Sequence, residues 1–187
     1  MGPEETVERS DPELIASIRA GERAGFDELM RRYERLVYKV VFGFARRRED
    51  ALDLTQSSFL KAFQGLDEYR GDASFKTWLL RIAYHEGLNW TRGAERRGAG
   101  VELDDAAPRL ALAATQESEL EARQRLGTVQ RALSRLNGRY RTTILLRYVD
   151  EMSIRDIAAV LACSEAMTKN ILFRGVRQLR RAMAEAG

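Results

Sequence analysis

Basic and amide side chains gather on the outer faces of a helix that the sequence predicts near its carboxyl end. From Ser164 onward, apolar residues recur every three or four positions, which is typical of a helix with one buried face. The positions between them carry Lys169, Asn170, Arg174 and Arg177. Such groups can reach phosphates and base edges when a helix lies in the major groove of DNA. The pattern therefore predicts duplex binding.

The residues before this helix complete the pattern of a helix-turn-helix. Ser153 and Asp156 form a variant capping box for a preceding helix of about two turns. The tripeptide from Ala162 to Ser164 then makes a tight joint, in which Cys163 is interpreted as a small buried hydrophobe rather than a reactive thiol. Spacing alone leaves open a helical hairpin with a solvated basic face.

A second stretch, residues 69–92, suggests a different chemistry, because aromatic and basic residues alternate along it. This composition is typical of proteins that stack unpaired bases while holding the sugar-phosphate backbone. Phe75 and Trp78 share one helical face and are predicted to be core residues. The polar side chains off that face are the candidates for contact with nucleic acid: Lys76, Arg81, His85, Asn89 and Arg92.

The composition argues against catalysis and against a metal site. One histidine and one cysteine exclude an internal disulfide and the usual four-ligand zinc site. No paired carboxylates, activated nucleophile or glycine-rich phosphate loop accompanies His85. We therefore expect no enzymatic activity, no catalytic residue, no metal and no cofactor. No apolar run approaches the ~18 residues of a membrane-spanning helix, so we expect a cytoplasmic protein without direct membrane insertion.

Helical periodicity extends over nearly the whole chain of 187 residues, and no strand-like alternation of useful length interrupts it. The fold class is therefore predicted to be all-α. Between residues 93 and 118, glycine, proline and acidic residues replace the apolar pattern, which is typical of a linker. We predict two small helical domains, residues 1–94 and 119–187, joined by a flexible linker at 95–118. The second domain contains the helix-turn-helix.

The net charge of +3 conceals a separation of charge along the chain. Residues 31–92 carry 12 basic and 8 acidic groups, and residues 123–187 carry 13 and 5. The first 30 residues and residues 93–122 are acidic. Positive charge is thus concentrated in the two parts predicted to contact nucleic acid, where it attracts phosphates.

Two segments resemble a known family. The run from Asp50 to Phe63 and the run from Phe75 to Ala83 are similar to conserved region two of bacterial extracytoplasmic-function (ECF) sigma factors. The segment from Leu146 to Val149, together with residues 153–174, looks like their region four. The resemblance implies a dissociable subunit that binds RNA polymerase core enzyme and directs promoter recognition, DNA opening and transcription initiation.

The resemblance also implies roles for individual residues. It implies that the segment 53–61 docks on the polymerase clamp and that the loop 70–74, with the helix after it, captures the unwound minus-ten strand. The helix after Ser164 would read the minus-thirty-five element of promoter DNA. Family members are commonly inhibited by an anti-sigma factor, often membrane-embedded, which would hold the protein near the inner membrane. The polymerase-docking candidates are Asp53, Gln56, Phe59, Leu60 and Lys61; the minus-ten candidates are Arg70, Ser74, Lys76, Arg81, His85, Asn89 and Arg92; the minus-thirty-five candidates are Lys169, Asn170, Phe173 and Arg174, with Arg177 from the same basic helix.

Several residues depart from the family pattern. His85 occupies a position where some members have an asparagine that reads a flipped-out base, so we expect a different minus-ten preference. Ile171 stands where many relatives carry arginine, which we expect to remove one DNA contact. The segments 55–58 in the clamp helix and 166–168 at the start of the recognition helix also differ. We expect these changes to alter the promoter sequence rather than abolish function.

Two other functions remain open at this stage. A stand-alone helix-turn-helix regulator would form a homodimer and bind a palindromic operator. An RNA-binding or RNA-modifying protein could use the aromatic and basic helix, but this interpretation leaves the helix-turn-helix unexplained.

Overall fold

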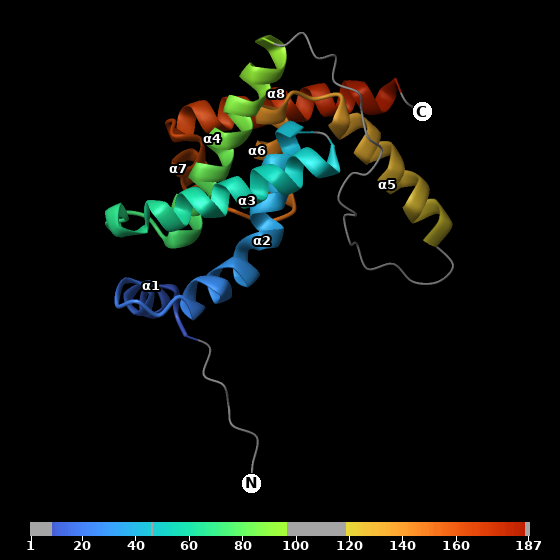
Figure 1. Cartoon of the computed structure of the whole chain (residues 1–187). Coiled ribbons are helices and arrows are strands. Elements are labelled where there is room, and N and C mark those ends of the chain that lie inside the picture. The colour runs from blue at the N-terminus through green and yellow to red at the C-terminus, as the bar shows by residue number, and fades with distance from the viewer. Residues whose placement is uncertain (1–8, 46, 97–118, 186–187) are drawn as a thin grey trace, which may run out of the picture.

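The fold was analysed in a computed structural model, which describes residues 9–45, 47–96 and 119–185, with side chains from residue 127 onward in the last range. These residues form α-helices and one short 3-10 turn and contain no strand, which confirms the all-α class. Most of the predicted linker therefore lies outside the described residues. In chain order the elements are α1 (Asp11–Arg19), α2 (Ala24–Ala45), α3 (Arg48–Gln64), η1 (Leu66–Glu68), α4 (Phe75–Arg96), α5 (Glu119–Ser134), α6 (Gly138–Tyr148), α7 (Ile154–Leu161) and α8 (Glu165–Ala184) (Figure 1).

The amino-terminal part is built around α2, which packs against α1, α3 and α4 (Figure 1). The short η1 contacts α1 and α3. Its apolar residues recur at helical spacing, and Leu29, Val37 and Val41 are completely buried. From α4, Leu79 and Leu80 are equally buried. The helices α2, α3 and α4 thus form a small bundle that fixes the exposed faces of α3 and α4.

The carboxyl-terminal part contains the predicted helix-turn-helix, formed by α7 and α8. Ser153 Oγ accepts a hydrogen bond from the Asp156 amide at 3.1 Å, and Ser164 Oγ accepts one from the Met167 amide at 3.2 Å. These caps satisfy backbone groups that the first turn of a helix leaves unpaired. Between the helices Ala162 is left-handed, with φ 52°. The sequence prediction of two capped helices with a tight joint is confirmed.

The guanidinium of Arg141 holds α5 against α6. This side chain is buried, and it donates to the carbonyl oxygens of Leu133 at 2.8 Å, Ser134 at 2.7 Å and Leu136 at 2.8 Å. These carbonyls lie at the carboxyl end of α5, where backbone acceptors lack partners within the helix and a cation is favoured. The three hydrogen bonds from Arg141 thus fix the turn between α5 and α6, as a capping side chain fixes the end of a helix.

The two parts pack against each other, which the sequence did not indicate. Leu146, Ile157 and Ile171 belong to the same buried apolar cluster as the core of α2, α3 and α4. At the crossing of α2 and α6, the hydroxyl of Thr142 donates to the carbonyl oxygen of Val40 at 3.2 Å. The structure therefore shows a closed arrangement, in which α6 and α7 cover one side of α2 and α4.

Candidate nucleic-acid and polymerase interfaces

The outer face of α8 is exposed along its whole length. Its fully buried residues are Thr168, Ile171, Gly175 and Ala182. Leu172, Val176 and Leu179 are half-buried and pack against the apolar cluster formed by α5 and α6, so only the polar face of α8 points away from the bundle. Phe173 is 67% exposed, although it is a large aromatic residue. An exposed aromatic ring among cationic and amide groups suits contact with nucleic acid. The five minus-thirty-five candidates are all on this exposed surface: Lys169, Asn170, Phe173, Arg174 and Arg177.

Ile171 lies on the opposite side of α8. It is 5% exposed and packs in the cluster shared with the amino-terminal part. In this arrangement position 171 faces the core, so its side chain is not on the surface that carries Lys169 and Arg174. Ile171 thus contributes apolar packing in this arrangement. That isoleucine here removes one DNA contact stays a prediction.

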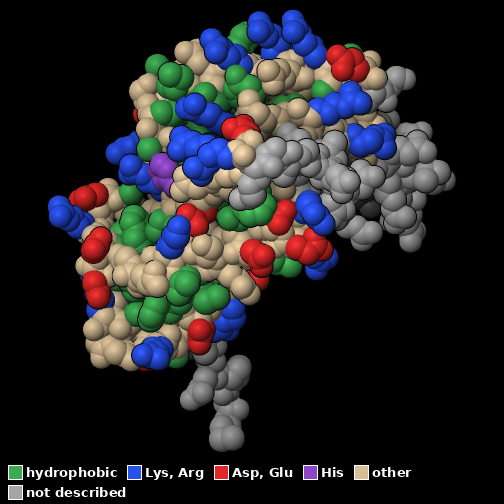
Figure 2. Space-filling view, turned by 45° about the horizontal axis from the view of Figure 1, so that its top comes forward, with side chains coloured by type: hydrophobic (Ala, Val, Ile, Leu, Met, Phe, Trp, Pro, Cys, Tyr) green, Lys and Arg blue, Asp and Glu red, His purple; other side chains and the backbone are tan. Residues whose placement is uncertain are grey.

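The polar residues of α4 form one exposed stripe. Arg81, His85, Asn89 and Arg92 follow each other at steps of four, four and three residues, which places them on one side of the helix. All four are exposed, whereas Lys76 at the start of the helix is half-buried. Figure 2 shows Lys and Arg side chains gathered around the single histidine. Of the two aromatic residues predicted to be core, Phe75 is 2% exposed, whereas Trp78 is half-buried and packs against the edge of the core.

The loop before α4 is held by short hydrogen bonds. Tyr69 Oη donates to the carbonyl oxygen of Ala73 at 2.6 Å and so connects the two ends of the loop. Ser74 Oγ accepts from the Thr77 amide at 3.2 Å, which starts α4, and Gly71 adopts φ 80°, a value that glycine tolerates best. Burial raises the pKa of the Tyr69 hydroxyl above its ordinary value. Arg70 and Ser74 are exposed at the ends of this ordered loop.

The outer face of α3 is partly apolar. Leu52, Leu60 and Phe63 are 43%, 58% and 41% exposed, and Gln56 lies between them at helical spacing. Asp53 is exposed beside this stripe. Exposed large hydrophobic residues on one helix face mark a protein contact rather than a nucleic-acid contact. Leu52 and Phe63 were not among the predicted docking residues, but their spacing from Gln56 and Leu60 could have identified them.

Two of the predicted docking residues have other contacts in this structure. Phe59 is 3% exposed and its ring lies edge-on to Phe26, so it supports α3 from beneath and presents no surface. Lys61 is exposed, but its Nζ pairs with Glu86 Oε1 of α4 at 2.5 Å. Ser57 Oγ donates to the other carboxylate oxygen of Glu86 at 2.8 Å. No sequence signal marked Glu86, which connects the docking helix to the helix that carries the basic stripe.

A cavity of about 670 Å³ separates the loop 69–73 from the helix-turn-helix joint. Its walls include Arg70, Trp78 and Arg81 on one side and Ala162 and Cys163 on the other. Cys163 is half-buried, with Sγ 3.3 Å from Thr168 Oγ1, in keeping with a packing role. The minus-ten candidates near the loop thus face the carboxyl-terminal part across an open space.

A further tyrosine, Tyr84, lies in α4, and its side chain is buried. Burial raises the pKa of Tyr84, while nearby Arg139 acts to lower it and Cys163 to raise it. No group of His, Cys, Asp and Glu side chains within the described ranges is arranged to hold a metal ion. Likewise, no helix among these residues combines the length and apolar character needed to cross a membrane.

Two family models match the chain, in the order in which the two parts occur. Residues 29–97 match Sigma-70 region 2, and residues 126–179 match Sigma-70, region 4. The first match contains α3, the loop and α4, and the second contains the helix-turn-helix. The fold, the exposed surfaces and these matches therefore define the class of the protein: a sigma factor with a region 2 part and a region 4 part.

Curated relatives narrow this class. The chain is 33% identical over 174 residues to the ECF RNA polymerase sigma factor SigM of Mycobacterium tuberculosis, covering 93% of this chain and 85% of the relative. It is 28% identical over 184 residues to the RNA polymerase sigma-H factor of Pseudomonas aeruginosa, covering 95% of both. The chain belongs to the ECF family of RNA polymerase sigma factors. It is therefore an alternative sigma factor, which argues against the stand-alone regulator.

Solved structures show the same fold. The structure of CnrH in complex with the cytosolic domain of CnrY has a TM-score of 0.65 at 21% identity, covering 93% of this chain and 97% of that one. The sigma factor RpoE in complex with the anti-sigma factor NepR from Bartonella quintana also has a TM-score of 0.65, at 22% identity, with coverages of 85% and 96%.

Proposed function

We propose that this protein is a dissociable subunit that binds RNA polymerase core enzyme, recognises a promoter at two places and helps to open it. The observation that carries the proposal is the presence of two separate exposed basic faces, on α8 and α4, in a chain of the ECF sigma family. The protein acts by binding; we assign it no catalytic residue, metal or cofactor.

The α8 face is suited to duplex DNA at the minus-thirty-five element. A helix fits the major groove, and Arg174 and Asn170 carry the groups that favour guanine and adenine respectively. Lys169 and Arg177 provide positive charge for the phosphates, and Phe173 provides an exposed apolar contact. Cooperation with polymerase supplies the remaining binding energy, so we expect the free protein to bind promoter duplex poorly.

The α4 stripe and the loop 70–74 are suited to a single strand. DNA opening costs stacking energy, which is offset when unpaired bases are held by protein. Arg81, Asn89 and Arg92 offer contacts to the backbone and base edges along the helix, and Arg70 and Ser74 lie at the adjacent loop. His85 stands at the centre of the stripe, where its ring can donate, accept or stack. We therefore infer that His85 contributes to the minus-ten preference.

The exposed stripe of α3 is assigned to the polymerase core. Leu52, Gln56, Leu60 and Phe63 form a continuous strip of mixed apolar and amide character, and Asp53 lies beside it. Apolar anchors with a polar rim are what a protein partner buries. Lys61 remains a docking candidate, although contact with polymerase would have to replace or include its pairing with Glu86.

The closed arrangement must open for this function. The minus-ten and minus-thirty-five elements are by their numbering roughly 25 base pairs apart, or about 85 Å at the ~3.4 Å rise of B-DNA. A compact body of this chain length is about 40 Å across, so its two basic faces cannot reach both elements while the parts are packed together. We therefore propose residues 1–94 and 119–187 as separately moving functional parts, with residues 95–118 as the connection.

An anti-sigma factor is inferred as a further partner. Two chains of the same fold are found in complexes: CnrH with the cytosolic domain of CnrY, and the sigma factor RpoE with the anti-sigma factor NepR. The apolar strip on α3 is a surface that such an inhibitor would have to cover to prevent polymerase docking. We infer from this a cytoplasmic protein, held near the inner membrane if the inhibitor is membrane-embedded.

In vitro transcription tests the proposal. Purified protein is combined with RNA polymerase core over a genomic promoter library, and the expected result is a set of start sites that core alone does not produce. An absence of such start sites would overturn the proposal. Size-exclusion chromatography separates it from a stand-alone regulator, because we expect a monomer that forms a one-to-one complex with core, whereas a regulator would be a homodimer.

A further inference from the structure

Arg19, in the last turn of α1, is bonded to the segment that leads into the minus-ten loop. Its Nη2 atom donates to the carbonyl oxygen of Leu66 at 2.8 Å and to that of Tyr69 at 2.6 Å. These carbonyls lie at the start and just past the end of η1, immediately before Arg70. One guanidinium thus connects α1 to residues about fifty positions further along the chain.

The second of these carbonyls belongs to the residue that closes the loop. The ring of Tyr69 packs against Phe75 and Trp78, with centroids 6.0 and 5.1 Å apart, and its hydroxyl donates to the Ala73 carbonyl oxygen. Arg19 therefore fixes the backbone of Tyr69, and the Tyr69 side chain fixes the far end of the loop. The connection from α1 to Ala73 is continuous and consists of short hydrogen bonds.

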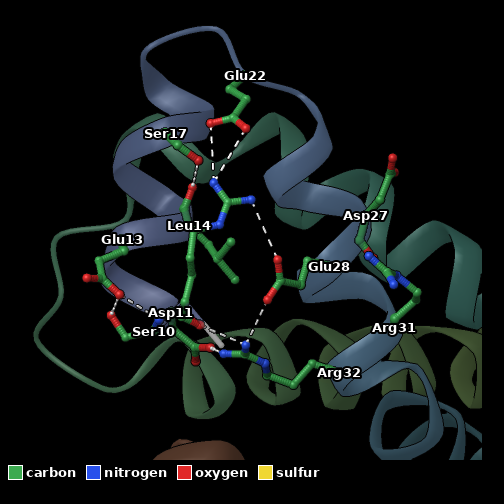
Figure 3. Close-up of polar contacts among 11 residues, drawn as sticks. Ser10, Asp11, Glu13, Leu14, Ser17, Glu22, Asp27, Glu28, Arg31 and Arg32 are labelled. Atoms are coloured by element: carbon green, nitrogen blue, oxygen red, sulfur yellow. Dashed lines mark hydrogen bonds and ion pairs between the residues drawn. The ribbon is translucent and has the colours of Figure 1, made fainter. Parts of the chain in front are cut away.

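The helix α1 is itself firmly attached to α2, as Figure 3 shows. Asp11 accepts hydrogen bonds from Arg32 and from Tyr33, both at 2.5 Å. Leu14 is completely buried beneath the helix. At its first turn, the Glu13 carboxylate accepts from the amide and the hydroxyl of Ser10, both at 2.7 Å, which lowers the pKa of Glu13. The position of Arg19 is therefore determined by α2, on which α4 also packs.

We propose that Arg19 is a positioning residue for the capture of the opened minus-ten strand. Held by Arg19 and Tyr69, the loop 70–74 is ordered before DNA arrives, so that binding does not have to include the entropy cost of ordering it. Arg19 itself does not need to touch DNA. This inference rests on the proposed function, because it takes the loop as part of the strand-binding surface.

The test compares Arg19→Ala with the wild-type chain in the holoenzyme. The probes are a single-stranded oligonucleotide with the minus-ten element, and a duplex with the minus-thirty-five element, both taken from the strongest promoter found in the library experiment. We expect Arg19→Ala to lower the affinity of the holoenzyme for the single-stranded probe by about tenfold. This corresponds to the loss of roughly one charged hydrogen bond. Affinity for the duplex probe and for core should stay within about twofold.

Two further variants separate positioning from other roles. Tyr69→Phe removes the hydroxyl that holds Ala73 and keeps the ring. It should therefore also lower the affinity for the single-stranded probe, and not the affinity for the duplex probe or for core. Arg23→Ala removes an exposed positive charge four residues after Arg19 and should have little effect. If Arg23→Ala gives an equal loss, Arg19 acts through charge and the proposal is overturned.

The possible failures are distinguishable. If the wild-type holoenzyme does not initiate or does not bind the single-stranded probe, the proposed function fails. If it binds and Arg19→Ala binds equally well, the positioning role alone is wrong. If Arg19→Ala loses core, duplex and single-strand binding together, with a lower Tm, the residue is structural and the inference is also overturned.

Discussion

At the scale of single residues, Arg174 offers the clearest test of DNA recognition. It is exposed on the outer face of α8, on the helix that would enter the major groove. We expect Arg174→Ala to weaken minus-thirty-five recognition by on the order of 1–3 kcal/mol if the side chain reads a base, with relaxed preference at one position. Holoenzyme binding to a library of single-base promoter variants measures this effect.

A charge-matched control accompanies Arg174. Arg131 is an exposed arginine of α5, in the same part of the chain but away from the recognition helix. Arg131→Ala should leave promoter preference unchanged. If Arg174→Ala weakens all promoter variants uniformly, Arg174 contacts the phosphate backbone and does not read a base.

Glu86 gives a second residue-scale prediction, this time on stability. Its carboxylate is 10% exposed and accepts from Lys61 Nζ and Ser57 Oγ. Glu86→Ala should lower the free energy of unfolding by about 1–3 kcal/mol, because it removes two hydrogen bonds to a carboxylate, one of them an ion pair. Urea unfolding measures the loss, with the exposed Glu95→Ala on the same helix as a control. An unchanged unfolding free energy for Glu86→Ala would show that the pair is not stabilising.

Residue types predicted the exposed basic faces well, since charged side chains at helical spacing are rarely buried. The same reasoning did not find Arg19 or Glu86, because each acts on residues far away in sequence. The family resemblance also placed Phe59 among the polymerase-docking residues, whereas its side chain is buried. Resemblance assigns a role to a position, but only packing shows whether the side chain at that position faces outward.

At the scale of elements, the joint of the helix-turn-helix holds a residue in an unfavourable conformation. Ala162 has φ 52° and ψ 46°, a region that disfavours residues with a Cβ atom. Ala162→Gly should therefore raise the free energy of unfolding by about 0.5–1 kcal/mol. Thermal or urea unfolding of the purified variant measures the change.

The neighbouring helix provides the opposite control. Ala159 is exposed in the interior of α7, where glycine costs about 0.5–1 kcal/mol relative to alanine. The same substitution should thus stabilise the chain at 162 and destabilise it at 159. Destabilisation at both positions would mean that the joint is not strained.

The ends of helices could be predicted from the sequence where a capping residue or a break in the apolar pattern marks them. Ser153 and Ser164 were identified from the sequence, because a serine before an apolar run has a direct structural consequence. The attachment of α1 to η1 could not be identified in this way, since it depends on two carbonyl oxygens that any residue could supply. When a side chain bonds to a backbone carbonyl oxygen, the type of the accepting residue gives no indication of the contact.

At the scale of the whole molecule, the sequence predicted two helical parts but not the surface between them. Their contact contains Lys39 and Asp150, paired at 2.5 Å. The second carboxylate oxygen of Asp150 is itself buried and has no hydrogen-bond partner in the structure. A polar contact that is incompletely satisfied stabilises weakly. A junction of this kind suits two parts that must separate on a promoter.

The crossing of α2 and α6 allows this separation to be tested. A Cβ atom at Gly43 would overlap the Thr142 hydroxyl, and one at Gly138 would come within 2.9 Å of the Gly43 carbonyl oxygen. Gly43→Ala should favour the open form without harming α2, because alanine improves helix propensity by about 1 kcal/mol. We expect a larger radius of gyration by small-angle X-ray scattering, and a larger one still in Gly43→Ala with Gly138→Ala.

The matched control for opening is Gly127→Ala, since a Cβ atom there makes only an ordinary contact, 3.8 Å from Nη1 of Arg131, and meets no part of α2. This variant should keep the wild-type radius of gyration. Because the closed form cannot span both promoter elements, the open variants should also bind core and promoter at lower concentrations than the wild-type chain. If the double variant keeps the wild-type radius, Thr142 and Phe44 rearrange to accept the added atoms, and the α2–α6 crossing does not control opening.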